Sequence, residues 1–282
     1  MNPTPPIAEG AIHIVVALHE EAKPLISHFS LQRIQNTKSF PLYSNADETI
    51  WLIVSGKGKS NAAAAVNFLA GLRQSFPHSA WLNIGIAGHR THELGTLVLA
   101  RKVVDEARSN SFYPTMHREQ KLLNSTLMSV DALIDNYPND ICLDMEASAF
   151  CHNAKRFANV ELVHCLKIIS DNAKSPWKEL DKIGMSELFS PCLGDIASFT
   201  ENLLNLSCIE EKQNAEPLFF REVITKWKFS QTQAHQVRAL LERWNALAET
   251  GSPLDIYEKE TKSAKEFLHC IENHLAQVQL RI

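Results

Sequence analysis

The chain has 282 residues, of which 45% are hydrophobic and 21% are charged, as is ordinary for a globular protein. Its length suffices for one large domain or for a domain with an appendage. The formal net charge of −4 predicts no nucleic-acid-binding surface. No apolar run approaches the roughly 20 residues of a membrane span, and the first ten residues lack the basic and apolar regions of a signal peptide. We therefore expect a cytoplasmic protein that uses no membrane.

The cysteine and histidine spacings predict no metal site and no cofactor. There is no C-x-x-C pair and no H-E-x-x-H motif among the 12 histidines and six cysteines, so the usual zinc patterns are missing. Reduced, buried thiols are the favoured interpretation of the cysteines.

Short apolar runs recur along the first two thirds of the chain and end in glycine or acidic residues. A helix-forming segment such as 19–29 or 60–72 follows several of them. This alternation predicts an α/β fold, a three-layer sandwich with a mostly parallel or mixed central sheet flanked by helices. Ligands of such folds collect where strands end. The expected strands lie within residues 11–18, 48–56, 80–89, 94–104 and 161–171.

The last third of the chain has a different character. We expect a main domain over residues 11–206, a polar linker over 207–216 and a small helical extension over 217–282. Ser230 and Gln233 are spaced as a capping box at the start of an amphipathic helix. The extension could dock on the main domain, pair with another subunit or bind a protein partner.

Two glycine turns follow expected strands. The turn "SGKGKSN" contains Gly56 and Gly58, but Ile53 stands where a phosphate-binding P-loop requires glycine, which excludes that motif. What remains is a helix N-terminus that suits an anion or a polar sugar, or a tight turn with no ligand. In the second turn, "NIGIAGH", Gly85 and Gly88 let the backbone approach a ligand closely.

Three acidic residues stand at expected strand ends. Glu21 follows the first strand, Glu146 follows "CLDM", and Asp171 ends "KIISD". A structural explanation is available for each, because first-turn acids stabilise helix N-termini and an aspartate can serve as an N-cap. A shared role at the sheet edge is the alternative.

Taken in order, six segments resemble the nucleoside phosphorylase and nucleosidase superfamily, and most closely its branch that hydrolyses methylthioadenosine and S-adenosylhomocysteine. The resemblance spans roughly residues 11–206 and is most specific in Met-Glu-Ala-Ser and Ile-Ser-Asp. The segments are "VVALHEEAKPL", "IVSGKGKSNAAAA", "NIGIAG", "LGTLVLARKVVDEA", "LDMEASAF" and "KIISDNA".

The resemblance implies N-glycosidic bond cleavage of a purine nucleoside or thionucleoside. Glu146 would accept hydrogen bonds from the ribose 2′- and 3′-hydroxyls, and Met145 would pack on the sugar. Asp171, steadied by Ser170, would donate a proton to the departing base at N7. Glu21 would orient and deprotonate the attacking water.

The resemblance also implies further contacts to the substrate. Between "VVDEA" and "CLDMEA" the segment that normally lines the base is shortened and altered. Phe112 and Tyr113 could stack on the base there, or Tyr113-Pro114 could be a turn plug. The other implied contacts are Asp144, Gly56, Gly58, Ile86, Ala87 and Gly88.

Hydrolysis is preferred to phosphorolysis, because superfamily phosphorylases hold phosphate with arginines and a serine. The turn at Asn83 and Ile86 provides neither, and Lys57, Lys59 and Arg101 are expected to have solvated tips. Hydrolases usually carry serine where Ile86 stands, so a nucleoside-binding protein with decayed catalysis and a partner-binding tail is an alternative. The resemblance implies a homo-oligomer.

Overall fold

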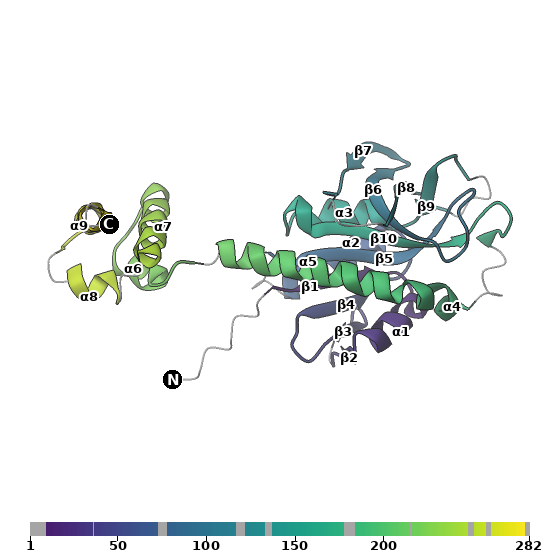
Figure 1. Cartoon of the computed structure of the whole chain (residues 1–282), viewed down its shortest axis with the longest axis horizontal. Coiled ribbons are helices and arrows are strands. Elements are labelled where there is room, and N and C mark those ends of the chain that lie inside the picture. Colours follow the sequence, from purple (N-terminus) through teal and green to yellow (C-terminus); the bar gives the residue numbers. More distant parts are fainter. Residues whose placement is uncertain are drawn as a thin grey trace. The chain divides into compact units, whose positions relative to one another are not determined.

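A mixed β-sheet forms the centre of the first of two units, into which the chain divides between Gln213 and Asn214 (Figure 1). The computed structural model describes residues 10–35, 37–72, 78–116, 122–132, 137–177, 184–214, 216–247, 251–257 and 261–279. The strands are β1 Ile12–Val16, β2 Gln32–Arg33, β3 Leu42–Ser44, β4 Ile50–Val54, β5 Ala80–Gly88, β6 Leu97–Asp105, β7 Arg108–Phe112, β8 Leu123–Ser129, β9 Ile141–Asp144 and β10 Val163–Asp171.

Five of these strands close into a ring, which the alternation of strands and helices does not predict. β5 pairs with β10 in parallel and with β9 at Gly88, and the circuit continues from β10 through β6 and β8 back to β9. β1 pairs in parallel with the edge of β5 opposite β10, and β4 pairs in parallel with β1. The antiparallel β3 and β2 complete the sheet. The sheet is thus mixed.

Helices cover the sheet on two sides and confirm the expected layers. The helical elements of this unit are α1 His19–His28, α2 Lys59–Leu72, α3 Ala147–Ala154, the 3-10 turns Val160–Leu162 and Ser190–Cys192, α4 Met185–Phe189 and α5 Leu193–Asn214. One apolar cluster joins the sheet to α1, α4 and α5, and a second joins it to α2 and α3 (Figure 1). β1 is buried along its whole length and is largely apolar. The equally buried β10 also carries His164, Lys167, Ser170 and Asp171.

The C-terminal end of α5 is anchored to the sheet. Ser207 is fully buried, and its hydroxyl accepts a hydrogen bond from the Ala11 amide at 3.0 Å and donates to the His78 carbonyl at 2.8 Å. Residues 207–214, which we expected to begin a linker, therefore belong to α5. Their Glu, Lys and Gln residues look like linker sequence by polarity but are good helix formers.

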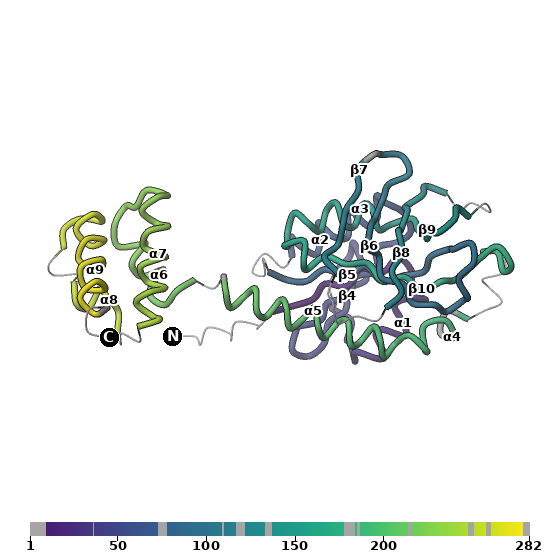
Figure 2. The backbone as a smooth tube through the Cα atoms, turned by 45° about the horizontal axis from the view of Figure 1, so that its top comes forward, coloured from purple at the N-terminus to yellow at the C-terminus, as the bar shows by residue number. Residues whose placement is uncertain are grey.

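The second unit is helical (Figure 2) and has its own apolar core. Its helices are α6 Phe220–Lys226, α7 Gln231–Ala246, α8 Pro253–Tyr257 and α9 Ala264–Gln279. The expected capping box is present, since the Gln233 amide donates to the Ser230 hydroxyl at 3.2 Å and the Ser230 amide donates to the Gln233 side chain at 2.9 Å. Within the described parts of both units, no helix is both long and apolar enough to cross a bilayer.

Candidate active site

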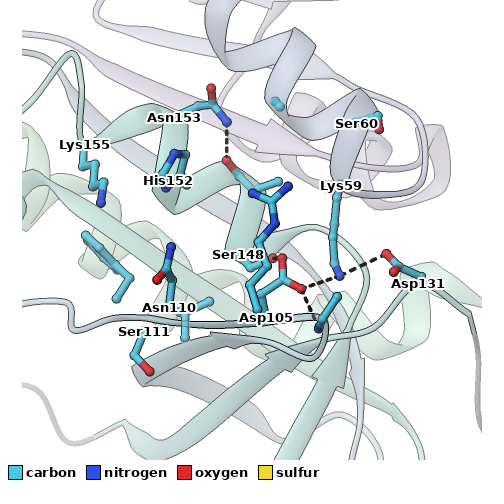
Figure 3. A pocket seen from close by; sticks show the side chains of 16 residues that line it. Lys59, Ser60, Asp105, Asn110, Ser111, Asp131, Ser148, His152, Asn153 and Lys155 are labelled. Atoms are coloured by element: carbon cyan, nitrogen blue, oxygen red, sulfur yellow. Dashed lines mark hydrogen bonds and ion pairs between the residues drawn. The ribbon is translucent and has the colours of Figure 1, made fainter.

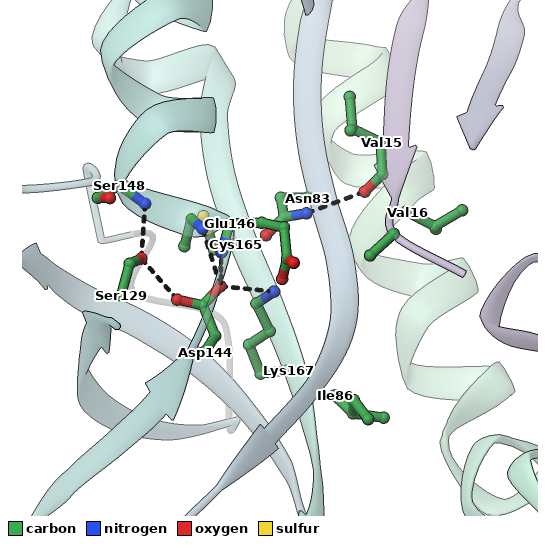
Figure 4. Close-up of polar contacts among 12 residues, drawn as sticks. Val15, Val16, Asn83, Ile86, Ser129, Asp144, Glu146, Ser148, Cys165 and Lys167 are labelled. Atoms are coloured by element: carbon green, nitrogen blue, oxygen red, sulfur yellow. Dashed lines mark hydrogen bonds and ion pairs between the residues drawn. The ribbon is translucent and has the colours of Figure 1, made fainter. Parts of the chain in front are cut away.

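A buried lysine in the middle of β10 organises the candidate site (Figure 4). The Nζ atom of Lys167 lies 2.9 Å from Oδ2 of Asp144, and both side chains are excluded from solvent. Burial by itself lowers the pKa of the ammonium group, but attraction by Asp144 and then Glu146 outweighs it and raises the pKa well above its usual value. Lys167 therefore remains charged and counterbalances the surrounding carboxylates.

Glu21 reaches this cluster from the first turn of α1. Its Oε2 atom accepts hydrogen bonds from the amides of Ala17 at 2.9 Å and Leu18 at 2.8 Å, and Oε1 accepts one from Ile86 at 3.1 Å. Burial raises the pKa of the Glu21 carboxyl, and the opposing attraction of Lys167 does not cancel that effect. Glu21 both caps α1 and presents a proton-accepting group to the end of β5.

Glu146 approaches the same lysine from the junction of β9 and α3. Its Oε1 atom accepts a hydrogen bond of 2.7 Å from the Gly58 amide, and Gly58 itself has a positive φ of 96° that favours glycine. Burial raises the pKa of Glu146, while Lys167 opposes the rise. The glycine turn before α2 and the acid before α3 are thus directly joined.

Asp144 bonds to both Lys167 and the Glu146 amide. Ser129 donates a hydrogen bond of 2.6 Å to Oδ1, while the amides of Glu146 and Ala147 donate to Oδ2 at 3.2 and 2.8 Å, alongside Lys167. Because these partners already engage both oxygens, the structure places Asp144 as a support for Glu146 and Lys167. This placement departs from the expected sugar contact.

The missing side chain of Gly85 leaves room for Glu21 and Lys167. It is the register partner of Lys167 in the parallel pair of β5 and β10. A Cβ atom added at Gly85 would lie 3.0 Å from Oε1 of Glu21 and 3.3 Å from Nζ of Lys167. The close backbone approach expected for this glycine turn is therefore made by buried charged groups of the chain itself.

Asp171 ends β10, four residues beyond Lys167. The Ser170 hydroxyl donates to Oδ1 at 2.5 Å, and the Tyr137 hydroxyl donates to Oδ2 at 2.5 Å. A Cβ atom at Gly88 would lie 2.5 Å from this Oδ2 and 2.7 Å from Cε1 of Tyr137. The neighbouring His89 amide donates to the Asp171 carbonyl at 3.0 Å. Asp171 is thus buried against a glycine and an aromatic ring.

The remaining expected substrate contacts are distributed unevenly. The Ile86 amide donates a hydrogen bond to Glu21, whereas Ala87 is buried in the core cluster shared with α2 and α3. Met145 packs against the small apolar cluster that contains Tyr137. Gly56 has a positive φ of 86°, and its amide donates to the Ala17 carbonyl at 3.0 Å.

For Phe112 and Tyr113 the sequence left open base stacking or a turn plug, and both residues make other contacts. Phe112 packs against the α2–α3 core cluster, and Tyr113 is 60% exposed with the Lys102 ammonium 5.5 Å from its ring centroid. Phe112 also lines a separate surface pocket of about 390 Å³ between α2, α3, β6 and β7 (Figure 3).

The pocket in Figure 3 contains an ion-pair network of its own. Lys59 contacts Asp105 at 2.8 Å and the exposed Asp131 at 3.0 Å. Burial of Asp105 raises the pKa of its carboxyl, but the hydrogen bonds from Lys59, the Ala107 amide and Ser148 and the charge of Lys59 together outweigh burial and lower the pKa. Lys59 is therefore committed to these aspartates, while Lys57 and Arg101 are exposed.

Sequence reasoning missed Lys167 and Tyr137. Lys167 had a detectable signal, because a lone lysine in an otherwise apolar strand is almost never buried without an acidic partner. Tyr137 had no such signal, since it stands in the polar stretch "DNYPND".

In the described ranges, no group of three or more His, Cys, Asp or Glu side chains is arranged to hold a metal ion.

Comparison with known proteins identifies the fold. No protein-family model and no curated protein matches the sequence. The 5′-methylthioadenosine nucleosidase of Arabidopsis thaliana superposes with a TM-score of 0.58 at 19% sequence identity, over 71% of this chain and 98% of that one. The 5′-methylthioadenosine/S-adenosylhomocysteine nucleosidase of Neisseria meningitidis, in complex with methylthio-immucillin-A, gives a TM-score of 0.52 at 13% identity, over 71% of this chain and 99% of that one. The corresponding protein of Colwellia psychrerythraea, in complex with adenine, gives 0.51 at 15% identity, over 72% of this chain and 95% of that one. The chain therefore shares the fold of these solved 5′-methylthioadenosine/S-adenosylhomocysteine nucleosidases.

Proposed function

We propose that the protein hydrolyses the N-glycosidic bond of a purine nucleoside or thionucleoside. The observation that carries this proposal is the convergence of Glu21 and Glu146 on the buried Lys167, with Asp171 at the end of the same strand. A packed core gives no reason to bury the carboxylates of Glu21, Asp144 and Glu146 around the ammonium group of Lys167, because charged groups lose solvation there. Burial raises the pKa values of Glu21 and Glu146, and acids perturbed in this way are frequent at functional sites.

Glu146 is the proposed ribose ligand. Gly58 engages Oε1, and a carboxylate retains further acceptor positions that suit two adjacent hydroxyl donors. Met145 would pack against the sugar. Hydrogen bonds to a carboxylate are charge-assisted and stronger than neutral ones, which suits this residue to hold the sugar during bond cleavage.

Glu21 is the proposed base for the attacking water. Its burial raises the pKa of the carboxyl, and a raised pKa brings a carboxylate closer to the value at which a general base works best near neutrality. Lys167 would stabilise the resulting charges at this site and hold Glu21 and Glu146 in place.

Asp171 is the proposed proton donor to the leaving base. Cleavage builds negative charge on the base, which a proton delivered from a carboxylic acid neutralises. The Ser170 hydroxyl orients the group through Oδ1. The similar protein of Colwellia psychrerythraea was solved with adenine and that of Neisseria meningitidis with methylthio-immucillin-A, which supports adenine as the first base to test.

The charge balance of the site supports hydrolysis rather than phosphorolysis. Three carboxylates surround one ammonium group, so a phosphate dianion would enter an already negative, desolvated environment at large cost. Lys59 is engaged by Asp105 and Asp131. Water meets no such penalty.

Ribose release from a panel of adenine, hypoxanthine and 5′-thio nucleosides, with and without phosphate, tests the proposal. We expect release that does not depend on phosphate. Asp171→Asn should lower kcat by about 10²–10⁴-fold while the circular dichroism spectrum is retained. Asp195 is exposed, so Asp195→Asn is a matched control that should leave kcat unchanged. Activity that is nil without phosphate would instead identify a phosphorylase.

A nucleoside-binding protein without turnover is the second candidate. The contact between Tyr137 and Asp171 favours it, because the expected proton donor is already engaged by a residue of the chain. Nucleoside binding by calorimetry without ribose release would establish this candidate. A homo-oligomer and a protein partner for the helical unit stay predictions, which light scattering and affinity capture address.

A further inference from the structure

Tyr137 fills the space beside Asp171 that a leaving base requires. Its hydroxyl lies 2.5 Å from Oδ2, and its Cε1 atom lies 2.7 Å from the Cβ position of Gly88. The side chain is 5% exposed and packs with Val130, Leu143 and Met145. Tyr137 thus places a planar ring beside Gly88 and a polar atom on Asp171, which are contacts that an aromatic base would also make.

The two oxygens of Asp171 leave little choice of position for a base. Ser170 donates a hydrogen bond to Oδ1, and the Tyr137 hydroxyl donates one to Oδ2. A base that receives a proton from Asp171 must come within about 3 Å of a carboxyl oxygen. It therefore competes with Tyr137 for the same atom and for the surface over Gly88.

We propose that Tyr137 is a resident competitor of the leaving base and thereby a specificity-determining residue of the site. This inference rests on the proposed function. A ligand that binds only when the ring is displaced has an apparent Kd equal to its intrinsic Kd divided by the displaced fraction. The protein therefore binds a free purine weakly and favours substrates whose sugar contacts to Glu146 offset the displacement of Tyr137.

Adenine binding, measured by calorimetry on the full-length protein, tests this inference. Tyr137→Ala removes the ring and the hydroxyl, and we expect adenine to bind at least about tenfold more tightly than to the wild type. Tyr137→Phe keeps the ring and loses only the hydroxyl, so it should give a smaller gain. Tyr257→Phe is the matched control, because it removes a tyrosine hydroxyl bonded to His274 in the helical unit and should leave the Kd unchanged.

The outcomes separate this inference from the proposed function. If Tyr137 were only a core residue, Tyr137→Ala would lower the unfolding temperature without tightening adenine binding, and the inference would be wrong. Should Tyr137→Ala fail to fold, the Tyr137→Phe Kd decides: equal or weaker binding than the wild type overturns the inference. Ribose release by the wild type judges the proposed function independently of either Kd.

Discussion

The Nζ atom of Lys167 lies 2.9 Å from Oδ2 of Asp144, with both side chains shielded from solvent. Glu21 and Glu146 also act on this ammonium group. The candidate site is thus held together by one buried cation, whose removal leaves several carboxylates without compensation.

Lys167→Met should destabilise the first unit by about 3–5 kcal/mol at pH 7, because removing one partner of a buried ion pair strands the other. The pKa of Lys167 is raised above 10.5, so the stability that it contributes is fully present below that pH and is lost only as the pH rises through the higher folded-state value. Urea unfolding measures this difference.

The same variant should recover stability as the pH falls toward 4.5. Burial already raises the pKa values of Glu21 and Glu146, and loss of the lysine raises them further, so protonation removes the stranded charges. Lys59→Met is the control, because its partners include the exposed Asp131 and such pairs contribute about 1 kcal/mol or less. A pH-independent loss in Lys167→Met would contradict the role of Lys167.

The acidic limb of kcat/KM should lie above pH 4.5. Burial raises the pKa of Glu21 from its usual value of 4.5, and a general base works only when deprotonated, so activity rises as the pH passes through the raised value. Glu21→Gln should remove this limb and lower kcat by about 10²–10⁴-fold. Ribose release between pH 4.5 and 8 checks both, and an unshifted limb in Glu21→Gln would exclude Glu21 as the base.

Glu21→Gln should also alter the pH dependence of stability. Because the folded-state pKa of Glu21 is raised, its contribution to stability is present below the unfolded-state value and is lost as the pH rises through the folded one. The glutamine variant has no such loss. Its free energy of unfolding relative to the wild type should therefore improve from pH 4.5 toward neutrality, as measured by urea titration.

Gly85→Ala should destabilise the first unit by about 1–3 kcal/mol and reduce activity. The new Cβ would lie 3.0 Å from Glu21 Oε1 and 3.3 Å from Lys167 Nζ, so buried charged groups would have to move. Gly71→Ala is the matched control, since Gly71 lies on α2 with nothing near its Cβ position. It should stabilise the protein by about 0.5–1 kcal/mol. Equal effects of the two variants would contradict this explanation.

Ser230→Ala should weaken α7 by about 1 kcal/mol, because the hydroxyl accepts the Gln233 amide at the helix N-terminus. Amide hydrogen exchange should become roughly fivefold faster in α7 and stay unchanged in β5 and β10. Faster exchange in the β-sheet would show that the two units are energetically coupled.

Local sequence signals predicted the elements well and the boundary less well. The strands and the Ser230 capping box depend on neighbours close in sequence, so periodicity and spacing reveal them. Closure of β5 onto β9 at Gly88 depends on a pairing between distant segments, which periodicity does not encode. Residues 207–214 were misassigned because polarity alone does not distinguish a linker from a solvated helix face.

The candidate site divides in the same way. Glu21 follows β1, which runs parallel to β5 and β10, so a place at the same sheet edge as Asp171 could be expected for it. Glu146 follows β9, which pairs antiparallel to β5, so the rule for parallel strands does not account for its approach. Asp144 stood beside Glu146 in sequence, yet its carboxylate is directed to Ser129 and Lys167. The contact of Tyr137 with Asp171 joins residues 34 positions apart, and no spacing rule anticipates it.

Ser207 bonds the last turns of α5 to the residue before β1, across 196 positions of the chain. During synthesis the N-terminal strand therefore has no partner for the Ala11 amide until almost the whole first unit has left the ribosome. Contacts of such long sequence separation form slowly, because the loop-closure entropy must be overcome first. Nascent chains that end before α5 can already pair β1 with β4 and β5, but they lack the Ser207 hydroxyl that accepts the Ala11 amide.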